Sequence, residues 1–552
     1  MDKWGFLGTE RVFNGPWQAF ERALGRLLVH KGWEHVAVVG GSGDNGADVI
    51  ASNGKKEMVY QVKYRSKGGA VGKEIVEDVK RAMEFYNINN GCVVTNGYLS
   101  KGALDYLKNL KKSAYNVSFI EGRRLLAIND NLPLWPVSNH ELREYQALAL
   151  NSILQSFRNG DRSALLVLAT GLGKTFVAGK FLSQVYRRYS DMKVLILANK
   201  DDLIKQFDTA LWPHLPKGIA THLWDEQEKP KFNEGTTLAT FQSVFNQIKS
   251  NRSLPDYNIV IIDECHHAGA DTYKAVIEHI SPDFLLGMTA TPFRTDDRDI
   301  TEIFGKPVYS MDIIKGMKHG FLARVDYRIY TDNIDWDFVE KNSKKSLTVK
   351  DLNKKLFIPS RDDEIITLIK NVWEKERVNR AILFCASIEH CMQMEKSLLS
   401  YGYKARALFA GLDPWAREKY LREFRQGKID MLLAVDILNE GIDIPEVDLV
   451  IFLRVTHSRI IFLQQLGRGL RLSPGKKKVT VLDFVTDIKR VASLLSLSKQ
   501  GKEYKEDGVE VLDLNNFSIN FSDTTSESLL EAIIKDKFEI EDYDDASELF
   551  LP

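Results

Sequence analysis

Residues 165–175 read LLVLATGLGKT, and this stretch decides the fold of the centre of the chain. Its apolar run predicts a strand, its glycines predict a tight turn, and its lysine and threonine open a helix. In that arrangement backbone N–H groups and the helix dipole hold phosphate groups, so Lys174 is expected to neutralise the β- and γ-phosphates of ATP and Thr175 to ligate magnesium. Leu168 stands where the strict pattern has its first glycine. The residues expected at the phosphates are Thr170, Gly171, Gly173, Lys174 and Thr175.

A second buried strand is expected at residues 259–263, where the sequence continues as Asp-Glu-Cys-His. Two carboxylates at the end of such a strand suit nucleotide hydrolysis, because Asp263 can hold magnesium and Glu264 can polarise the attacking water. The order of the two motifs therefore predicts an ATP-hydrolysing site.

These motifs resemble those of superfamily 2 helicases, in the branch of restriction-enzyme motor subunits and XPB-like translocases, over residues 142–484. Further matches are REYQ at 143–146, TAT at 289–291, NEGID at 439–443 and QQLGRGLR at 464–471. The resemblance implies that Gln146 reads the adenine base and that an arginine meets the γ-phosphate when two domains close. The residues so implied at the nucleotide are Arg143, Gln146, His266, Gly441, Asp443, Gln464, Arg468 and Arg471.

Contacts with the nucleic-acid track are expected at two places in the first motor domain. Thr289 and Thr291 resemble the motif that couples the ATP state to the track. Thr240, Gln242 and Ser243 resemble a motif that touches the phosphodiester backbone, and their hydroxyl and amide groups suit phosphate. The same residue types also cap helices, so both interpretations stay open for them.

The first part of the chain has a different pattern. Residues 17–30 predict an amphipathic helix, and a glycine-rich stretch at 40–48 precedes two expected strands. Asp48 begins one strand and Gln61 and Lys63 end the next, so these side chains should converge at the open end of a hairpin. The glycines could instead form only a flexible turn, with Lys63 a solvated strand residue.

This block resembles the Mrr-like branch of the PD-(D/E)xK nucleases, in which glutamine replaces the more usual acid before the lysine. The match extends through GCVVTN at 91–96 and covers most of residues 12–128. The resemblance implies that Asp48 ligates magnesium, Lys63 activates water and stabilises developing charge, Gln61 positions the group, and Glu21 adds a second acidic contact. A degenerate domain that binds without cleaving is the alternative.

The chain as a whole is expected to be an α/β protein with several cores, because its 552 residues exceed one ordinary domain. We expect a restriction-endonuclease-like domain at 1–130, a linker at 131–141, two RecA-like parallel-sheet domains at 142–320 and 321–490, and a small helical, acidic extension at 491–552. A polar insertion or connector is expected at about 327–361. The expected core strands of the motor are residues 165–169, 194–198, 237–241, 259–263, 285–289, 381–385, 405–409, 431–435, 449–453 and 479–484.

Composition narrows the function classes. Basic and acidic residues number 75 each, but residues 1–130 hold nineteen of the basic and fourteen of the acidic ones, a net charge of +5 that favours polyanions. The four cysteines lack the spacing of a zinc site or a disulfide scaffold. No stretch predicts a signal peptide or a membrane span, so a soluble, cytoplasmic protein is expected.

The sequence therefore predicts an ATP- and Mg²⁺-dependent DNA helicase or translocase coupled to a DNA endonuclease, as in prokaryotic restriction or anti-phage defence. A protein partner from a defence operon is expected, and the oligomeric state is open. One alternative is a repair or recombination helicase whose first domain binds DNA without cutting. Another is an ATP-gated scaffold that recruits a partner nuclease.

Overall fold

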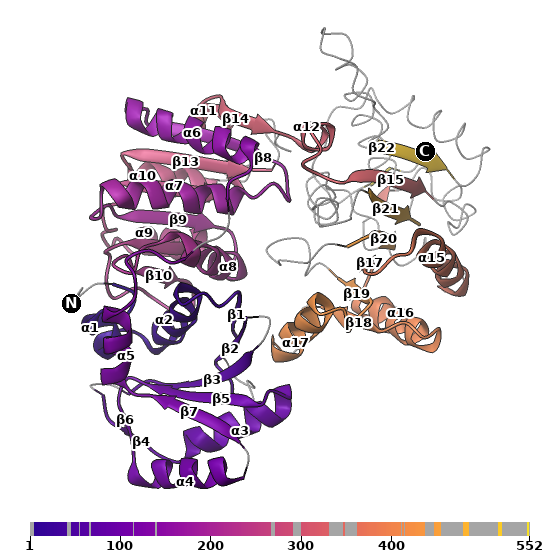
Figure 1. Ribbon diagram of the computed structural model, residues 1–552. Coiled ribbons are helices and arrows are strands. Elements are labelled where there is room, and N and C mark those ends of the chain that lie inside the picture. The colour runs from indigo at the N-terminus through magenta and orange to yellow at the C-terminus, as the bar shows by residue number, and fades with distance from the viewer. Residues whose placement is uncertain are drawn as a thin grey trace.

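The computed structural model places most of the chain in three sheet-based domains (Figure 1). The residues that the structure describes are 5–40, 46–53, 56–65, 68–113, 115–137, 141–265, 271–290, 300–329, 346–347, 362–409, 411–412, 414–435, 447–453, 478–484, 517–521 and 549–550.

The N-terminal domain is built on a five-stranded sheet of order β1-β2-β3-β5-β7. Strand β2 runs antiparallel to both of its neighbours, β1 and β3, whereas β3, β5 and β7 run parallel. One face of the sheet is covered by α2 and α5 and the other by α3 and α4. The strands are β1 (His35–Val38), β2 (Val49–Ser52), β3 (Glu57–Lys63), β5 (Asn90–Thr95) and β7 (Asn116–Ile120), with a small pair β4 (Ala70–Val71) and β6 (Tyr98–Leu99); the helices are α1 (Thr9–Asn14), α2 (Trp17–His30), α3 (Glu74–Tyr86), α4 (Lys101–Lys112) and α5 (Gly122–Asp130).

The first RecA-like domain, called domain 1 below, follows the N-terminal domain. It is built on a seven-stranded, all-parallel sheet of order β10-β11-β9-β12-β13-β8-β14. Its strands are almost wholly apolar because both faces are covered, by α6 to α8 on one side and α9 to α11 on the other. The strands are β8 (Ser163–Leu168), β9 (Val194–Ala198), β10 (Thr221–Trp224), β11 (Thr236–Thr240), β12 (Ile259–Asp263), β13 (Phe284–Thr289) and β14 (Pro307–Met311); the helices are α6 (Glu144–Asn159), α7 (Lys174–Arg188), α8 (Asp201–Leu211), η1 (Trp212–His214), α9 (Phe241–Lys249), α10 (Asp271–Ile280), α11 (Thr301–Phe304) and α12 (Ile313–Lys318).

Domain 2 repeats this topology with the order β18-β19-β17-β20-β21-β15-β22. When the strands of each domain are ranked along the chain, both sheets follow one and the same spatial order, and every pairing in domain 2 is also parallel. The tandem of two similar α/β domains expected from the sequence is therefore confirmed. The elements are β15 (Arg324–Ile329), α15 (Asp362–Glu376), β17 (Ala381–Cys385), α16 (Ile388–Ser400), β18 (Ala405–Leu408), α17 (Pro414–Arg425), β19 (Met431–Ala434), β20 (Leu449–Leu453), β21 (Lys478–Asp483) and β22 (Phe517–Phe521).

The ten expected core strands all occur, with ends shifted by at most two residues, and the expected helix at residues 17–30 is α2. The sequence missed β10 and β14, because short strands that carry His222 or begin with proline lack a clear apolar pattern. The expected connector at about 327–361 is corrected where the structure describes it, because residues 327–329 complete β15 and residues 346–347 form a further strand, β16.

The expected helical character of residues 491–552 is corrected for those that the structure describes. Residues 517–521 form β22 at the edge of the domain 2 sheet, and Leu549–Phe550 forms β23, which pairs with β16 (Ser346–Leu347). The alternation in FSINF suits an edge strand, which pairs with β15 only because the fold brings the two segments together. Local composition could not reveal that partner.

Candidate functional site

The loop between β8 and α7 has the shape that phosphate binding requires. Gly171 and Gly173 have φ angles of 91° and 87°, which favour glycine, and Gly173 directly precedes the first residue of α7. Thr170, Lys174 and Thr175 remain partly open to solvent at the head of this helix. Buried Leu172 anchors the loop, since its carbonyl accepts hydrogen bonds from Tyr145 and Gln146.

Lys174 contacts Glu264, with 2.9 Å between Nζ and Oε1, and both side chains are largely buried. Glu264 follows β12 with a φ of 48°, an unusual conformation for a residue with a side chain, which turns the chain sharply at the sheet edge. The neighbouring Cys265 is buried, and burial beside Glu264 and Asp263 raises the pKa of its thiol well above the ordinary value. The thiol therefore stays neutral next to the carboxylates.

A magnesium ion suits the donors present at this edge. Thr175 supplies a hydroxyl and Asp263 a carboxylate, and hard oxygen ligands of this kind are what Mg²⁺ prefers, with water and nucleotide phosphate completing the shell. β12 and β8 both flank β13 in the sheet, so their carboxyl ends lie at one edge. The donor set fits the ion that the motif implies.

Gln146 has a supporting role in this structure. Its Nε2 donates to the Leu172 carbonyl at 2.9 Å, and its Oε1 accepts from the backbone N–H of Arg143 at 3.0 Å. The Nε2 contact therefore holds the phosphate loop against α6, and the Oε1 contact caps the start of the same helix. Contacts of Arg143 and Gln146 with an adenine base stay a prediction.

The residues expected at the nucleic-acid track lie on the same domain. Thr240 caps α9, because its Oγ1 accepts from the N–H of Ser243 at 3.2 Å, so the capping interpretation is correct for this pair. Gln242 is exposed beside them, and Thr289 is fully buried at the end of β13. Contact of these residues with nucleic acid stays a prediction.

Several predicted residues lie outside the described part of the chain. They are His266, Thr291, Gly441, Asp443, Gln464, Arg468 and Arg471.

The second candidate site lies in the N-terminal domain, at the open end of the β2–β3 hairpin. Val49 pairs with Tyr60, and the Asp48 N–H donates to the Tyr60 carbonyl, so Asp48 lies beside Gln61 across the hairpin. The Asp48 Oδ2 accepts from the Val62 N–H at 2.5 Å. The hairpin expected from the sequence brings these residues together.

Glu21 of α2 joins Asp48 at this point. A Cβ atom placed on Gly40 would lie 2.7 Å from Glu21 Oε2 and 3.2 Å from Asp48 Oδ1, so both carboxylates adjoin the same small volume. Glu21 is 9% and Asp48 4% exposed. Burying two carboxylates side by side is unfavourable unless a cation or a proton compensates them.

Gln61 and Lys63 complete the set. Gln61 is buried, and its Oε1 accepts no hydrogen bond within the described residues, which leaves an amide oxygen for a ligand. Lys63 is exposed two residues further on the same strand face. Two carboxylates and an amide oxygen fit a magnesium ion, although no cluster of three or more histidine, cysteine, aspartate or glutamate side chains occurs in the described ranges.

Thr95 and Asn96, which hold the end of β3 in place, were not predicted as functional residues. Thr95 donates from Oγ1 to the Lys63 carbonyl at 2.8 Å. Buried Asn96 accepts from the Arg65 N–H at 2.7 Å and donates to the carbonyls of Arg65 and Val12 at 2.8 and 2.9 Å. They occur within the stretch matched to the nucleases, but only tertiary structure reveals what they hold.

Among the described helices, none has both the length and the apolar character to cross a bilayer.

Comparison with known proteins matches three regions of the chain to families. Residues 14–128 match the family model "Restriction endonuclease", residues 139–294 match "Type III restriction enzyme, res subunit", and residues 362–473 match "Helicase conserved C-terminal domain". Each candidate site lies in a separate matched region.

Individual relatives give the same picture. The putative mitochondrial ATP-dependent helicase irc3 of Schizosaccharomyces pombe is 30% identical over 64% of this chain and 58% of its own length. The type I restriction enzyme EcoAI endonuclease subunit of Escherichia coli is 26% identical over 62% of this chain and 46% of its own. The chain thus spans about half the length of these relatives.

A solved structure of the ATP-dependent type ISP restriction-modification enzyme LlaBIII bound to DNA matches 94% of this chain and 41% of that one, with a TM-score of 0.52 and 16% identity. This likeness concerns the fold. The three family matches and the arrangement of the three sheets thus show two regions of superfamily 2 helicase type, similar to restriction-enzyme subunits, joined to an N-terminal region similar to Mrr-like restriction endonucleases.

Proposed function

We propose that this protein uses ATP to move along or unwind DNA and cleaves DNA with its N-terminal domain in a magnesium-dependent reaction. The observation that supports the proposal is that one chain carries two separate clusters whose side chains suit hydrolysis. One is centred on Lys174 and Glu264, and the other on Asp48 and Glu21.

At the ATP site, Lys174 would exchange its contact with Glu264 for the β- and γ-phosphates. Glu264 would then be free to orient and polarise the attacking water. Magnesium bound by Thr175 and Asp263 would neutralise phosphate charge. Arg468 and Arg471 are the proposed arginines that meet the charge on the γ-phosphate when domain 2 closes on domain 1.

At the nuclease site, a bound magnesium ion would act as a Lewis acid on the scissile phosphate. Asp48 and Glu21 would hold it, with Gln61 contributing its amide oxygen. Lys63, which is exposed, would reach the phosphodiester, orient the water and stabilise charge that develops on the phosphoryl oxygens. Glu21 and Asp48 are buried and Lys63 is exposed, so a substrate arriving from solvent would reach the lysine before the metal.

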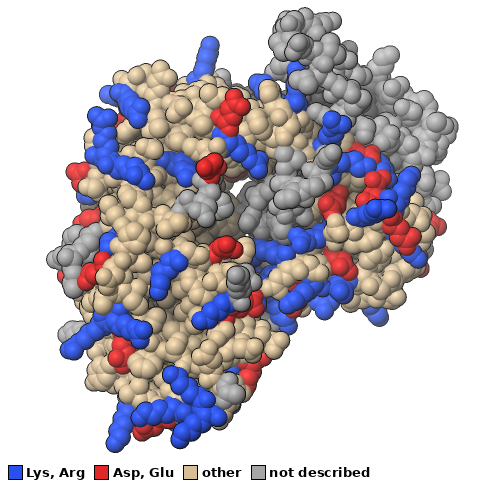
Figure 2. Space-filling view, viewed as in Figure 1, with Lys and Arg blue, Asp and Glu red and all other residues tan. Residues whose placement is uncertain are grey.

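DNA is the proposed substrate. The EcoAI relative is an endonuclease subunit of a type I restriction enzyme, and the N-terminal domain is basic. Figure 2 shows lysine and arginine side chains at the end of this domain formed by α4, where Lys101, Lys108, Lys111 and Lys112 are exposed. Such a surface attracts the phosphodiester backbone without reading sequence.

We further propose a cytoplasmic role in prokaryotic restriction or anti-phage defence, with a protein partner encoded beside it. A motor joined to an endonuclease suits scanning and destruction of foreign DNA. Recognition and protection of the cell's own DNA would come from the partner.

The test is cleavage of linear and circular duplex DNA with magnesium, with and without ATP. The unmodified protein is compared with Asp48→Ala and Lys174→Ala. DNA cleavage that is lost in Asp48→Ala supports the nuclease site. An effect of ATP on cleavage that disappears in Lys174→Ala supports coupling between the motor and the nuclease. Cutting that persists in Asp48→Ala would refute the assigned site.

A second function is favoured by one observation. The described residues around Asp48 provide two carboxylates rather than three acidic ligands. A repair or recombination helicase whose N-terminal domain binds DNA without cutting would need no strong metal site. DNA-stimulated ATP turnover with no cleavage at any magnesium concentration would support that function.

A further inference from the structure

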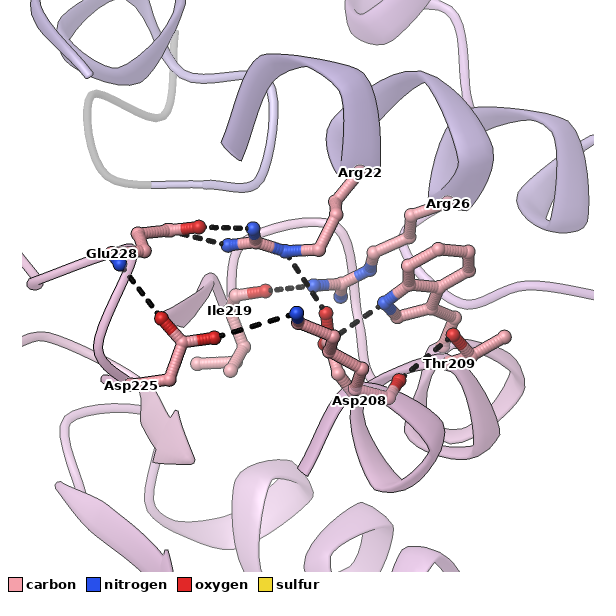
Figure 3. Close-up of polar contacts among 9 residues, drawn as sticks. Arg22, Arg26, Asp208, Thr209, Ile219, Asp225 and Glu228 are labelled. Carbon is pink, nitrogen blue, oxygen red and sulfur yellow. Dashed lines mark hydrogen bonds and ion pairs between the residues drawn. The ribbon is translucent and has the colours of Figure 1, made fainter. Parts of the chain in front are cut away.

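Helix α2 faces two domains at once. Glu21 adjoins Asp48 of the N-terminal domain beside Gly40. The neighbouring Arg22 and Arg26 face domain 1 (Figure 3). Gly25 also faces domain 1, since a Cβ atom there would meet Trp212. Positions 22, 25 and 26 are spaced three and four residues apart and so share one side of the helix. The candidate metal ligand and the interdomain contacts are therefore borne by the same two turns.

Arg22 makes the charged part of this contact. Its guanidinium forks onto the Glu228 carboxylate, with Nη1 bonded to Oε2 and 2.8 Å between Nη2 and Oε1, and its Nε lies 3.2 Å from Asp208 Oδ2. Asp208 is 0% exposed. Although burial alone would lower the pKa of Arg22, its contacts with Glu228 and Asp208 raise it, so the arginine stays charged.

Arg26 makes the second part. It is 1% exposed, and it donates from Nη1 to the Ile219 carbonyl at 2.7 Å and from Nη2 to the Pro216 carbonyl at 2.8 Å. Burial lowers its pKa to about 9, which still leaves it protonated at neutral pH. A planar, five-donor group of this kind fixes both the distance and the rotation of α2.

Gly25 sets how closely the domains approach. A Cβ atom at this position would lie 3.0 Å from the ring of Trp212, whose Nε1 donates to Asp208 Oδ1 at 3.0 Å. The helix therefore lies against the indole without a side chain between them. Domain 1 leaves α2 little room to rotate or shift.

We propose that Arg22 and Arg26 are positioning residues for the nuclease site, so that domain 1 forms part of its scaffold. Domain 1 holds α2 from one side, and α2 presents Glu21 to Asp48 on the other. The proposal rests on the proposed nuclease function. It implies that Glu21 and Asp48 are correctly placed to bind one metal ion only when the N-terminal domain is packed against domain 1.

The contact that Arg22, Gly25 and Arg26 make with domain 1, called the dock below, also lies close to the ATP site along the chain. Asp208 belongs to α8, which begins at Asp201, three residues after β9 ends. β9 pairs in parallel with β12, the strand that ends at Asp263. One helix therefore connects the nucleotide edge of the domain 1 sheet to the residue that holds Arg22.

The test measures metal binding apart from cleavage, in the full-length protein. Mn²⁺ replaces Mg²⁺ because it takes similar oxygen ligands, and its binding is followed by electron paramagnetic resonance. The variants are Arg22→Ala and Arg22→Lys, with Arg81→Ala as the control, since Arg81 is 60% exposed in an ion pair on α3. Circular dichroism first verifies that each variant is folded.

We expect Arg22→Ala to lower the affinity of the Asp48-dependent site for Mn²⁺ by about tenfold, which is typical when a residue that orients a metal ligand is removed. Arg22→Lys should lower this affinity less. The magnesium concentration for half-maximal cleavage should rise more in Arg22→Ala than in Arg22→Lys. Arg81→Ala should change neither the Mn²⁺ affinity nor this magnesium concentration. A lost fraction of folded protein would reduce the amount of bound metal but leave its affinity unchanged.

Mn²⁺ affinity in folded Arg22→Ala and Arg22→Lys that stays within twofold of the unmodified protein would overturn the proposal. If Arg22→Ala fails to fold, Arg22→Lys decides, because it keeps the charge but not the fork. Unchanged Mn²⁺ binding in Asp48→Ala and Glu21→Ala would instead refute the nuclease metal site itself. The two failures are thus distinguishable.

Discussion

Arg422 of α17 in domain 2 contacts Glu57 of the N-terminal domain, with 2.7 Å between Nη2 and Oε1. Glu57 begins β3 at the closed end of the hairpin whose open end carries Asp48 and Gln61. Figure 1 shows α17 next to the N-terminal domain, and Lys419 of the same helix lies over the Phe85 ring at 5.9 Å. Domain 2 thus contacts the N-terminal domain as well as domain 1.

This contact differs in kind from the dock on domain 1. Arg422 is 23% and Glu57 36% exposed, and an exposed ion pair contributes at most about 1 kcal/mol, so it can break readily. The buried Arg22–Asp208 contact cannot separate without leaving an uncompensated charge. Domain 2 should therefore move relative to the N-terminal domain, while domain 1 and the N-terminal domain stay together.

We predict that crosslinking between Glu57→Cys and Arg422→Cys with a flexible bis-maleimide depends on nucleotide. ATP binding in a Glu264→Gln background should change the rate by about threefold or more, because closure of the motor cleft displaces α17. The four native cysteines are buried and should react slowly.

The matched control is Asn14→Cys with Lys231→Cys. These exposed positions lie across the dock on domain 1, where the Lys231 Nζ donates to the Asn14 carbonyl at 3.2 Å. Their crosslinking rate should not respond to ATP. An equal response of both pairs would contradict a fixed dock.

Lys174→Ala should reduce ATP turnover to background while leaving the protein folded. The lysine is largely buried against Glu264 at the phosphate loop, where its charge serves the phosphates and its side chain adds little packing. Steady-state phosphate release checks this, with circular dichroism as the test of folding. Exposed Lys249→Ala, at the end of α9, should hydrolyse ATP normally. Turnover that survives in Lys174→Ala would exclude this loop as the ATP site.

Asn96→Asp should make DNA cleavage depend on pH. The new oxygen would face the carbonyls of Arg65 and Val12, to which Asn96 now donates, and an ionised carboxylate buried there is repelled. Only the protonated acid can donate in its place. We expect at least about a tenfold loss of cleavage at pH 8 relative to the unmodified protein, and a smaller loss at pH 6.

The control for this variant is Asn116→Asp. Asn116 is exposed, and its Nδ2 donates to the Asn90 Oδ1 at 2.6 Å. Its cleavage should follow the pH profile of the unmodified protein. A parallel profile for Asn96→Asp would mean that the Asn96 clamp does not position the Lys63 strand.

His222 should make the protein sensitive to acid. Burial lowers the pKa of this histidine in β10 from 6.5 to about 3, so between those values the unfolded chain binds one proton more than the folded chain. The stabilisation is complete above pH 6.5 and is lost as the pH falls towards 3. The free energy of unfolding should drop by roughly 1.4 kcal/mol for each pH unit in that window.

His222→Gln should remove this slope, because glutamine can still donate to the Glu234 carbonyl, the present partner of the histidine, without taking up a proton. Urea midpoints at pH 7.5, 6 and 5 measure the effect. The exposed His279→Gln serves as the control. Equal acid slopes in His222→Gln and the unmodified protein would refute the assignment.

The sequence alone determined the motor. Runs such as the strand before Lys174 and the strand that ends at Asp263 are apolar because both faces of a parallel sheet are covered, so strand position and motif order could be read locally. The hairpin that carries Asp48 and Gln61 could be predicted in the same way, since its two strands are close together in the chain. The positive φ angles at Gly171 and Gly173 are compatible with residue type, because glycine adopts them without strain.

Only the tertiary structure decided how these parts act on one another. Arg22 and Asp208 are far apart in sequence, as are Arg422 and Glu57, and nothing in their local patterns names a partner. The same holds for Asn96, whose amide binds the chain after β3 and the end of α1. Hydrophobic periodicity specifies a residue's own strand or helix, whereas a long-range polar contact depends on which surfaces folding brings together.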